Sequence, residues 1–211
     1  MIDKYLISNC LFIIDEFNER YKNLDSDSLR VIANNEYAEA DIAIKLGYQF
    51  RNMANFNFQG RSSDIVIKSK DFIIEVKYLR NFKSKFGTYT NKMTWHDAFE
   101  KNYSWLSNEV QKGKKGNRAF VIGWFNAVDR FSEIMQLGEG NGNSPNLNIE
   151  RSRYFPFLNR YGDSKKTKDI FYMYSNAYKE MSIPILGYSE ESINCVFIGK
   201  EEDKFHFCIY Y

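Results

Sequence analysis

The chain has 211 residues, of which 44% are hydrophobic and 17% aromatic, and its formal net charge is +2. This length favours one sizeable core over two independent domains, and the composition excludes a disordered chain, so we expect a single folded domain spanning residues 1–211. The nearly neutral charge gives no strong indication of a partner. Binding to nucleic acid would therefore require local clusters of basic residues.

The three cysteines, Cys10, Cys195 and Cys208, lack the spacing of a zinc site or of a secreted disulfide scaffold. Charged residues interrupt the apolar N-terminal stretch, and no run approaches the roughly 20 apolar residues of a membrane span. These features predict a soluble cytoplasmic protein without membrane contact.

The first half of the chain predicts two helices, three extended segments, a third helix and a strand. Residues 3–22 form an amphipathic helical pattern. The capping residues of LDSDS then predict a second helix that runs to about Leu46 and is stopped by Gly47. Residues 48–58 look extended, and the β-branched runs 63–68 and 72–79 predict a hairpin.

A third helix is expected over residues 93–111, followed by a buried strand, RAFVIGWF. Beyond residue 127 the pattern is weaker. It predicts a helix in DRFSEIMQL, a glycine-rich loop, a helix over 167–181 and a C-terminal β-hairpin.

Two charged residues interrupt the apolar pattern of segment 72–79. Because side chains alternate along a strand, Glu75 and Lys77 share a face with Ile73 and Leu79. Burying such charges is unfavourable unless a partner or a metal compensates. Asp64, at the start of the preceding strand, is placed to reach the same face. The alternative is a solvent-exposed ion pair for Glu75 and Lys77, and a turn-capping role for Asp64.

Two carboxylates and a lysine at one point are suited to a hard divalent cation such as Mg²⁺. A fourth acidic group is expected from the second helix. If this segment is one continuous helix, Glu36 lies about 60° from the centre of the helix's apolar stripe, and Glu39 lies about 120° from it. Glu36 is therefore expected to point inward and Glu39 towards solvent, although Glu36 could also be an ordinary surface residue.

The set Asp64 and Glu75-Val76-Lys77 resembles the D-X(n)-(D/E)-X-K signature of the PD-(D/E)XK nuclease superfamily, with Ser63 in place of the frequent proline. The resemblance implies an α/β fold with a mixed sheet and a restriction-endonuclease-like α-β-β-β-α-β core, here residues 27–126, with an elaboration over 127–211. It implies a metal site of Asp64, Glu75 and Glu36, a catalytic Lys77, and Mg²⁺ as cofactor, which Mn²⁺ is expected to replace. Glu36, about three turns before Gly47, matches the superfamily's helical glutamate.

Several basic residues near this set are candidates for phosphate contact. They are Arg61, Arg80, Lys83, Lys85 and Lys101. Two further basic runs, residues 112–118 and 165–168, could contact phosphate or form ordinary solvated surface.

The expected function is a Mg²⁺-dependent endonuclease that acts on DNA, as a type II restriction enzyme or a related defence nuclease. A homodimer would be needed to cut both strands at once. The alternatives are a non-catalytic module of the same fold that binds nucleic acid or a protein, a junction-type nuclease, or a nuclease acting on RNA.

Overall fold

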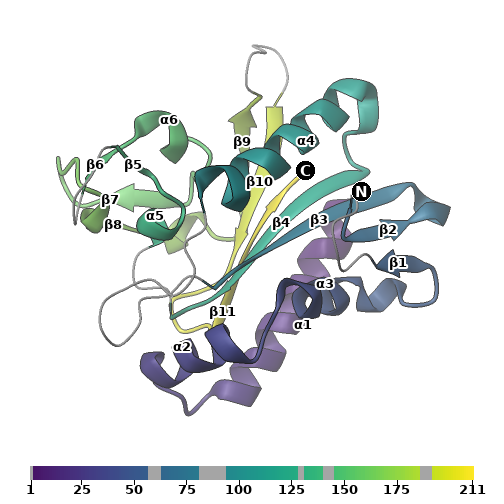
Figure 1. Cartoon of the computed structure of the whole chain (residues 1–211), viewed down its shortest axis with the longest axis horizontal. Helices are drawn as coiled ribbons and strands as arrows, with labels where there is room; N and C mark the ends of the chain where they lie inside the picture. The colour runs from purple at the N-terminus through teal and green to yellow at the C-terminus, as the bar shows by residue number, and fades with distance from the viewer. Residues whose placement is uncertain (1, 57–62, 81–93, 128–130, 140–144, 186–191) are drawn as a thin grey trace.

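The computed structural model describes residues 2–56, 63–80, 94–127, 131–139, 145–185 and 192–211. They form a seven-stranded mixed sheet with helices packed on both of its faces (Figure 1). This arrangement confirms the expected mixed α/β class. Among the described helices, none is long and apolar enough to cross a membrane.

The sheet has the strand order β1-β2-β3-β4-β11-β10-β9. Its strands are β1 (Ala54–Phe56), β2 (Ile65–Ile67), β3 (Phe72–Leu79), β4 (Arg118–Phe125), β9 (Glu180–Pro184), β10 (Ser192–Ile198) and β11 (Phe205–Tyr210). Strands β3 and β4 are parallel, whereas every other neighbouring pair is antiparallel. The predicted hairpin of β2 and β3 and the C-terminal hairpin of β10 and β11 are both confirmed.

Three helices cover one face of the sheet: α1 (Ile2–Tyr21), α2 (Ser26–Asn35) and α3 (Glu39–Gly47). The predicted stripe of α1, from Leu6 to Phe17, is buried against even-numbered residues of β3 such as Ile74 and Val76. The second predicted helix is in fact two helices, because the chain is not helical between Asn35 and Glu39.

Gly47 ends α3 as predicted, but not through a left-handed conformation, since its φ is −81°. A Cβ atom at this position would lie 2.3 Å from Cε1 of Phe56 in β1. The absence of a side chain at Gly47 therefore makes room for the Phe56 ring, and is not needed for the local geometry of the helix end.

The opposite face of the sheet is covered by the third predicted helix. A π-type turn (His96–Glu100), α4 (Lys101–Glu109) and a second π-type turn (Val110–Lys114) follow one another, and the chain leaves them at Gly113 with φ +78°. Its predicted apolar face is buried, from Trp95 to Val110. All eight residues of β4 are also buried, as expected for a strand covered on both faces.

The chain after residue 127 forms short elements and then the last three strands of the sheet. The short elements are α5 (Phe131–Ile134), β5 (Gly138–Glu139), β6 (Asn146–Leu147), α6 (Ile149–Ser152), β7 (Leu158–Arg160) and β8 (Ile170–Tyr172). The predicted helix over 167–181 is wrong, because β8 pairs with β7 there and β9 pairs with β10. Its aromatic run is stabilised by partners that lie far away in the sequence.

Candidate active site

The candidate site lies where strand β2 separates from β3. The two strands pair only from Phe72 to Ile74 of β3, which then continues to Leu79 beside β4. Two carboxylates occupy the edge that β2 leaves open. Asp64 Oδ2 accepts a hydrogen bond from the Val76 amide at 2.7 Å, and Glu39 Oε2 accepts one from the Tyr78 amide at 3.1 Å. Among the described residues, no strand offers these two amides a ladder partner at this edge, so the carboxylates take that place.

Glu75 and Lys77 project from the face of β3 that α4 covers, because their partners in β4, Phe120 and Ile122, belong to the core beneath α4. The Lys77 ammonium lies 3.1 Å from Oε1 and 3.0 Å from Oε2 of Glu39. Helix α3 packs on the other face of the sheet, so the open edge is what allows its first residue to reach Lys77.

The Glu75 carboxylate is the most perturbed group of the site. Its Oε1 atom is buried and has no hydrogen-bond partner among the described residues. Burial and, next, the nearby Asp64 carboxylate raise the pKa of Glu75 to about 8, against smaller opposing effects of Ser63 and Lys77. A carboxylate in this position is stable as an anion only if a positive charge compensates it.

The pKa of Asp64 is raised as well. Burial raises the pKa of its carboxyl group, while the hydrogen bond from the Val76 amide acts in the opposite sense. The register brings it beside Glu75, because the preceding pair is Ile65 with Ile74. Asp64, Glu75 and Lys77 therefore lie close enough for their charges to affect one another, as the alternation of side chains along the strand predicts.

These residues match the donor set that Mg²⁺ uses in proteins, which is one or two carboxylates with the remaining positions filled by water. The unpartnered Oε1 of Glu75 is an available oxygen donor beside Asp64. No group of three or more His, Cys, Asp or Glu side chains arranged to hold a metal occurs in the described part of the chain. A metal would therefore be held by Asp64 and Glu75, with Glu39 committed to Lys77 and Tyr78.

The expected orientation of the two helical glutamates is wrong. Glu36 is exposed at the C-cap of α2, whereas Glu39 is half-buried and contacts Lys77. The angles of about 60° and 120° hold only for one continuous helix, and the break at residues 36–38 resets the helical phase. Local signals of the break exist: Asn34 and Asn35 are weak helix formers, and an acidic first turn follows them.

The structure describes two of the five candidate phosphate contacts. Arg80 is exposed directly after β3, and Lys101 is exposed on α4. Arg61, Lys83 and Lys85 lie outside the described residues.

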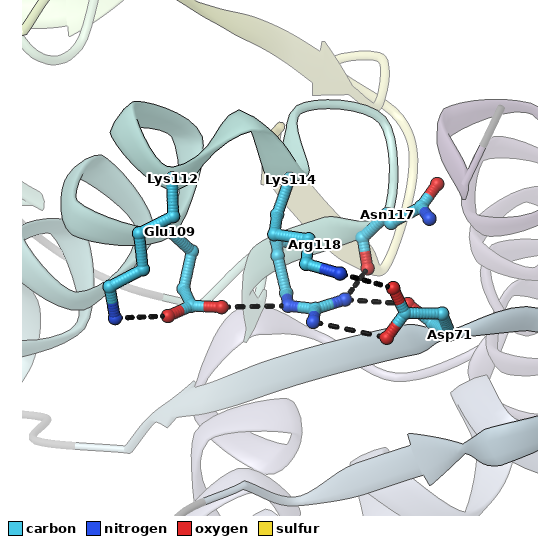
Figure 2. Close-up of polar contacts among 6 residues, drawn as sticks. All are labelled: Asp71, Glu109, Lys112, Lys114, Asn117 and Arg118. Atoms are coloured by element: carbon cyan, nitrogen blue, oxygen red, sulfur yellow. Dashed lines mark hydrogen bonds and ion pairs between the residues drawn. The ribbon is translucent and has the colours of Figure 1, made fainter.

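Three cations of the basic run 112–118 form ion pairs within the fold. Lys112 and Arg118 bind Glu109, while Lys114 and Arg118 bind Asp71, as Figure 2 shows. The Arg118 side chain is only 5% exposed. This network joins the start of β3 to the end of the α4 segment, away from Lys77, so it stabilises the fold.

Comparison of the chain with protein-family models, with curated proteins and with solved structures finds no match in any of the three. Any functional assignment therefore depends on the geometry and chemistry described above.

Proposed function

We propose that the chain is a metal-dependent nuclease of the PD-(D/E)XK type that hydrolyses phosphodiester bonds in DNA. The observation that carries the proposal is the meeting of Asp64, Glu75 and Lys77 at the open edge of β3, with Glu75 Oε1 buried and unpartnered. The order of elements from α2 to β4, with three antiparallel strands, a helix and a parallel strand, is a second line of support.

Each residue has a defined task in this proposal. Asp64 and Glu75 hold the metal, and the hydrogen bond from the Val76 amide fixes the Asp64 carboxylate. When bound, Mg²⁺ supplies an activated water and stabilises negative charge on a phosphodiester oxygen. The Lys77 ammonium orients the water or neutralises the developing charge. Glu39 holds that ammonium in place and is the helical acidic residue of the site, in place of Glu36.

The test is cleavage of plasmid, linear, branched and single-stranded DNA, and of an RNA oligonucleotide, with Mg²⁺ or Mn²⁺. Wild type is compared with Glu75→Gln and Lys77→Met, each expected to lower the rate roughly 100-fold or more. Glu19→Gln and Lys22→Met are matched controls, because this exposed ion pair at the C-terminal end of α1 lies outside the site. The substrate pattern distinguishes a restriction-type enzyme from a junction-specific or RNA-directed one.

Metal binding is measured separately by calorimetry with Mn²⁺. Wild type and the two control variants should bind, and Glu75→Gln should bind much more weakly. Equal cleavage by all five proteins would rule out this site. Double-strand cleavage in one binding event by a protein that sediments as a monomer would contradict the expected homodimer.

A non-catalytic nucleic-acid-binding module is the second candidate, and one observation favours it. Lys77 already has a carboxylate partner in Glu39, so the described residues do not leave its charge uncompensated. Binding of DNA without cleavage under any metal condition would support this candidate and reject the nuclease.

A further inference from the structure

A basic two-stranded element in the second half of the chain has no role in the candidate site. This element, the basic ribbon, consists of residues 158–172, which are strands β7 and β8 and their connecting loop. Its exposed cations are Arg160, Lys165, Lys166 and Lys168. Within residues 158–172 they are accompanied by two carboxylates, Asp163 and Asp169, and Asp169 accepts a hydrogen bond from the Ser164 hydroxyl. Among the described residues, Arg160, Lys165 and Lys166 form no ion pair, so their charges are available to a polyanion.

An exposed aromatic ring lies among these cations. Tyr161 is 66% exposed, although a tyrosine ring contributes substantial apolar area when it is buried. Its ring stacks on Phe171 of β8, with centroids 4.3 Å apart and planes inclined by 27°. Phe171 thus supports one face of the Tyr161 ring, and the exposed ring offers a flat surface to a partner.

Backbone hydrogen bonds hold the basic ribbon in shape. The Tyr161 amide donates to Asp169 O at 3.0 Å, and the Leu147 amide donates to Lys165 O at 2.6 Å. The Thr167 amide also donates to Pro145 O at 3.1 Å. A surface that is already ordered loses less conformational entropy when a ligand binds, which favours a recognition role over a passive loop.

The basic ribbon is attached at the end of the sheet where the candidate site lies. Trp124 Nε1 donates to the hydroxyl of Tyr172, the last residue of β8, at 3.1 Å. Trp124 pairs with Leu79, two residues beyond Lys77, and its side chain lies in the core under α4. The ribbon therefore packs on the same face of the sheet as Lys77, beside α4 in Figure 1.

We propose that the basic ribbon binds single-stranded nucleic acid, with Tyr161 stacking on an unpaired base and the neighbouring cations contacting phosphates. Bases inside a duplex stack on one another and present only their edges, whereas an aromatic face with nearby cations suits an unstacked base. The inference rests on the proposed function in that the bound strand would continue into the site of Asp64, Glu75 and Lys77.

The test is binding, measured by fluorescence anisotropy in EDTA so that no cleavage occurs. The probes are a fluorescein-labelled 20-nucleotide oligo-dT, an oligo-rU of equal length and a 20-base-pair duplex. Wild type should prefer a single strand, and Tyr161→Ala should weaken that binding about 5- to 100-fold. Tyr161→Phe should bind normally because the stack is kept. Tyr48→Ala, which removes a tyrosine that is 55% exposed elsewhere, should also bind normally.

The electrostatic part is tested by the salt dependence of oligo-dT binding. The slope of log K against log salt concentration is negative, and Lys166→Ala should reduce its magnitude by about 0.7, the contribution of one phosphate contact in a single strand. Lys4→Ala, an exposed lysine on α1, should leave the slope unchanged.

The two proposals fail in different ways. Normal oligo-dT binding by Tyr161→Ala, a preference for duplex, or no binding to any probe would overturn the inference. Cleavage by wild type together with normal binding by Tyr161→Ala would reject only the role of the basic ribbon. Binding that depends on Tyr161 without any cleavage would support the ribbon and reject the nuclease. The two single-strand probes distinguish a DNA ligand from an RNA ligand.

Discussion

Glu36 and Glu39 are three positions apart, yet only Glu39 contacts Lys77, so matched substitutions at the two positions test the site directly. We predict that Glu39→Gln destabilises the protein and slows cleavage, whereas Glu36→Gln does neither. Glutamine keeps the size of the side chain, removes its charge and replaces one of its two acceptor oxygens by an amide nitrogen.

The magnitude follows from the contacts of Glu39. Its carboxylate accepts hydrogen bonds from Lys77 Nζ and from the Tyr78 amide, both at 3.1 Å. Hydrogen bonds to charged groups contribute about 1.5–3 kcal/mol each. The Glu39 side chain is 38% exposed, so screening by solvent lowers the expected loss to about 1 kcal/mol for Glu39→Gln. Glu36 is exposed, and its substitution should change stability by less than about 0.5 kcal/mol.

Stability is measured by urea unfolding, followed by tryptophan fluorescence. Cleavage is measured under single-turnover conditions with Mg²⁺. A double-mutant cycle of Glu39→Gln with Lys77→Met should give a coupling energy of about 0.5–1 kcal/mol, because the two side chains are in contact. Equal effects at Glu36 and Glu39, or a coupling energy near zero, would show that Glu39 does not hold Lys77.

Three further predictions concern the fold. Arg118→Ala should lower the free energy of unfolding by about 2 kcal/mol in a urea titration, because it removes a buried guanidinium that binds two carboxylates, each of which keeps a lysine partner; a loss below about 0.5 kcal/mol would contradict the network in Figure 2. Burial lowers the pKa of His206 from 6.5 to about 4, so below pH 6.5 the unfolded chain binds a proton more readily than the folded one. The free energy of unfolding of wild type should therefore fall by up to about 3 kcal/mol between pH 6.5 and 4, relative to that of His206→Phe; parallel curves of the free energy of unfolding against pH would refute this. Gly47→Ala should lower the free energy of unfolding by about 1–3 kcal/mol through its clash with Phe56. A melting temperature equal to that of wild type would show that the Phe56 ring can move away.

The sequence alone predicted those features that depend on local periodicity. Alternation along residues 72–79 placed Glu75 and Lys77 on one face, and the short turn before Phe72 placed Asp64 beside them. The apolar stripes of α1 and of the α4 segment were predicted for the same reason, since a helical stripe is visible in the residue spacing. Each of these features depends only on residues that lie close together in the sequence.

Other features depended on contacts between distant segments. The basic residues near Arg118 looked like one surface cluster, but Asp71, which pairs with two of them, is more than forty positions away from both in the chain. The helix predicted over 167–181 gave way to strands because β7 and β10 offered backbone partners. Propensity in an aromatic run is weak compared with such pairing.

The candidate site depends both on local spacing in the sequence and on tertiary contacts. Spacing determined that Asp64, Glu75 and Lys77 would meet, because a hairpin fixes which residues lie opposite each other. The choice of Glu39 over Glu36 was decided by the tertiary structure. The break between α2 and α3 rotates one glutamate away, and the late start of β2, at Ile65, leaves open the edge through which the other reaches Lys77. Local periodicity cannot encode the helix phase across a break or the length of a strand pairing, since both are set by how the assembled layers pack.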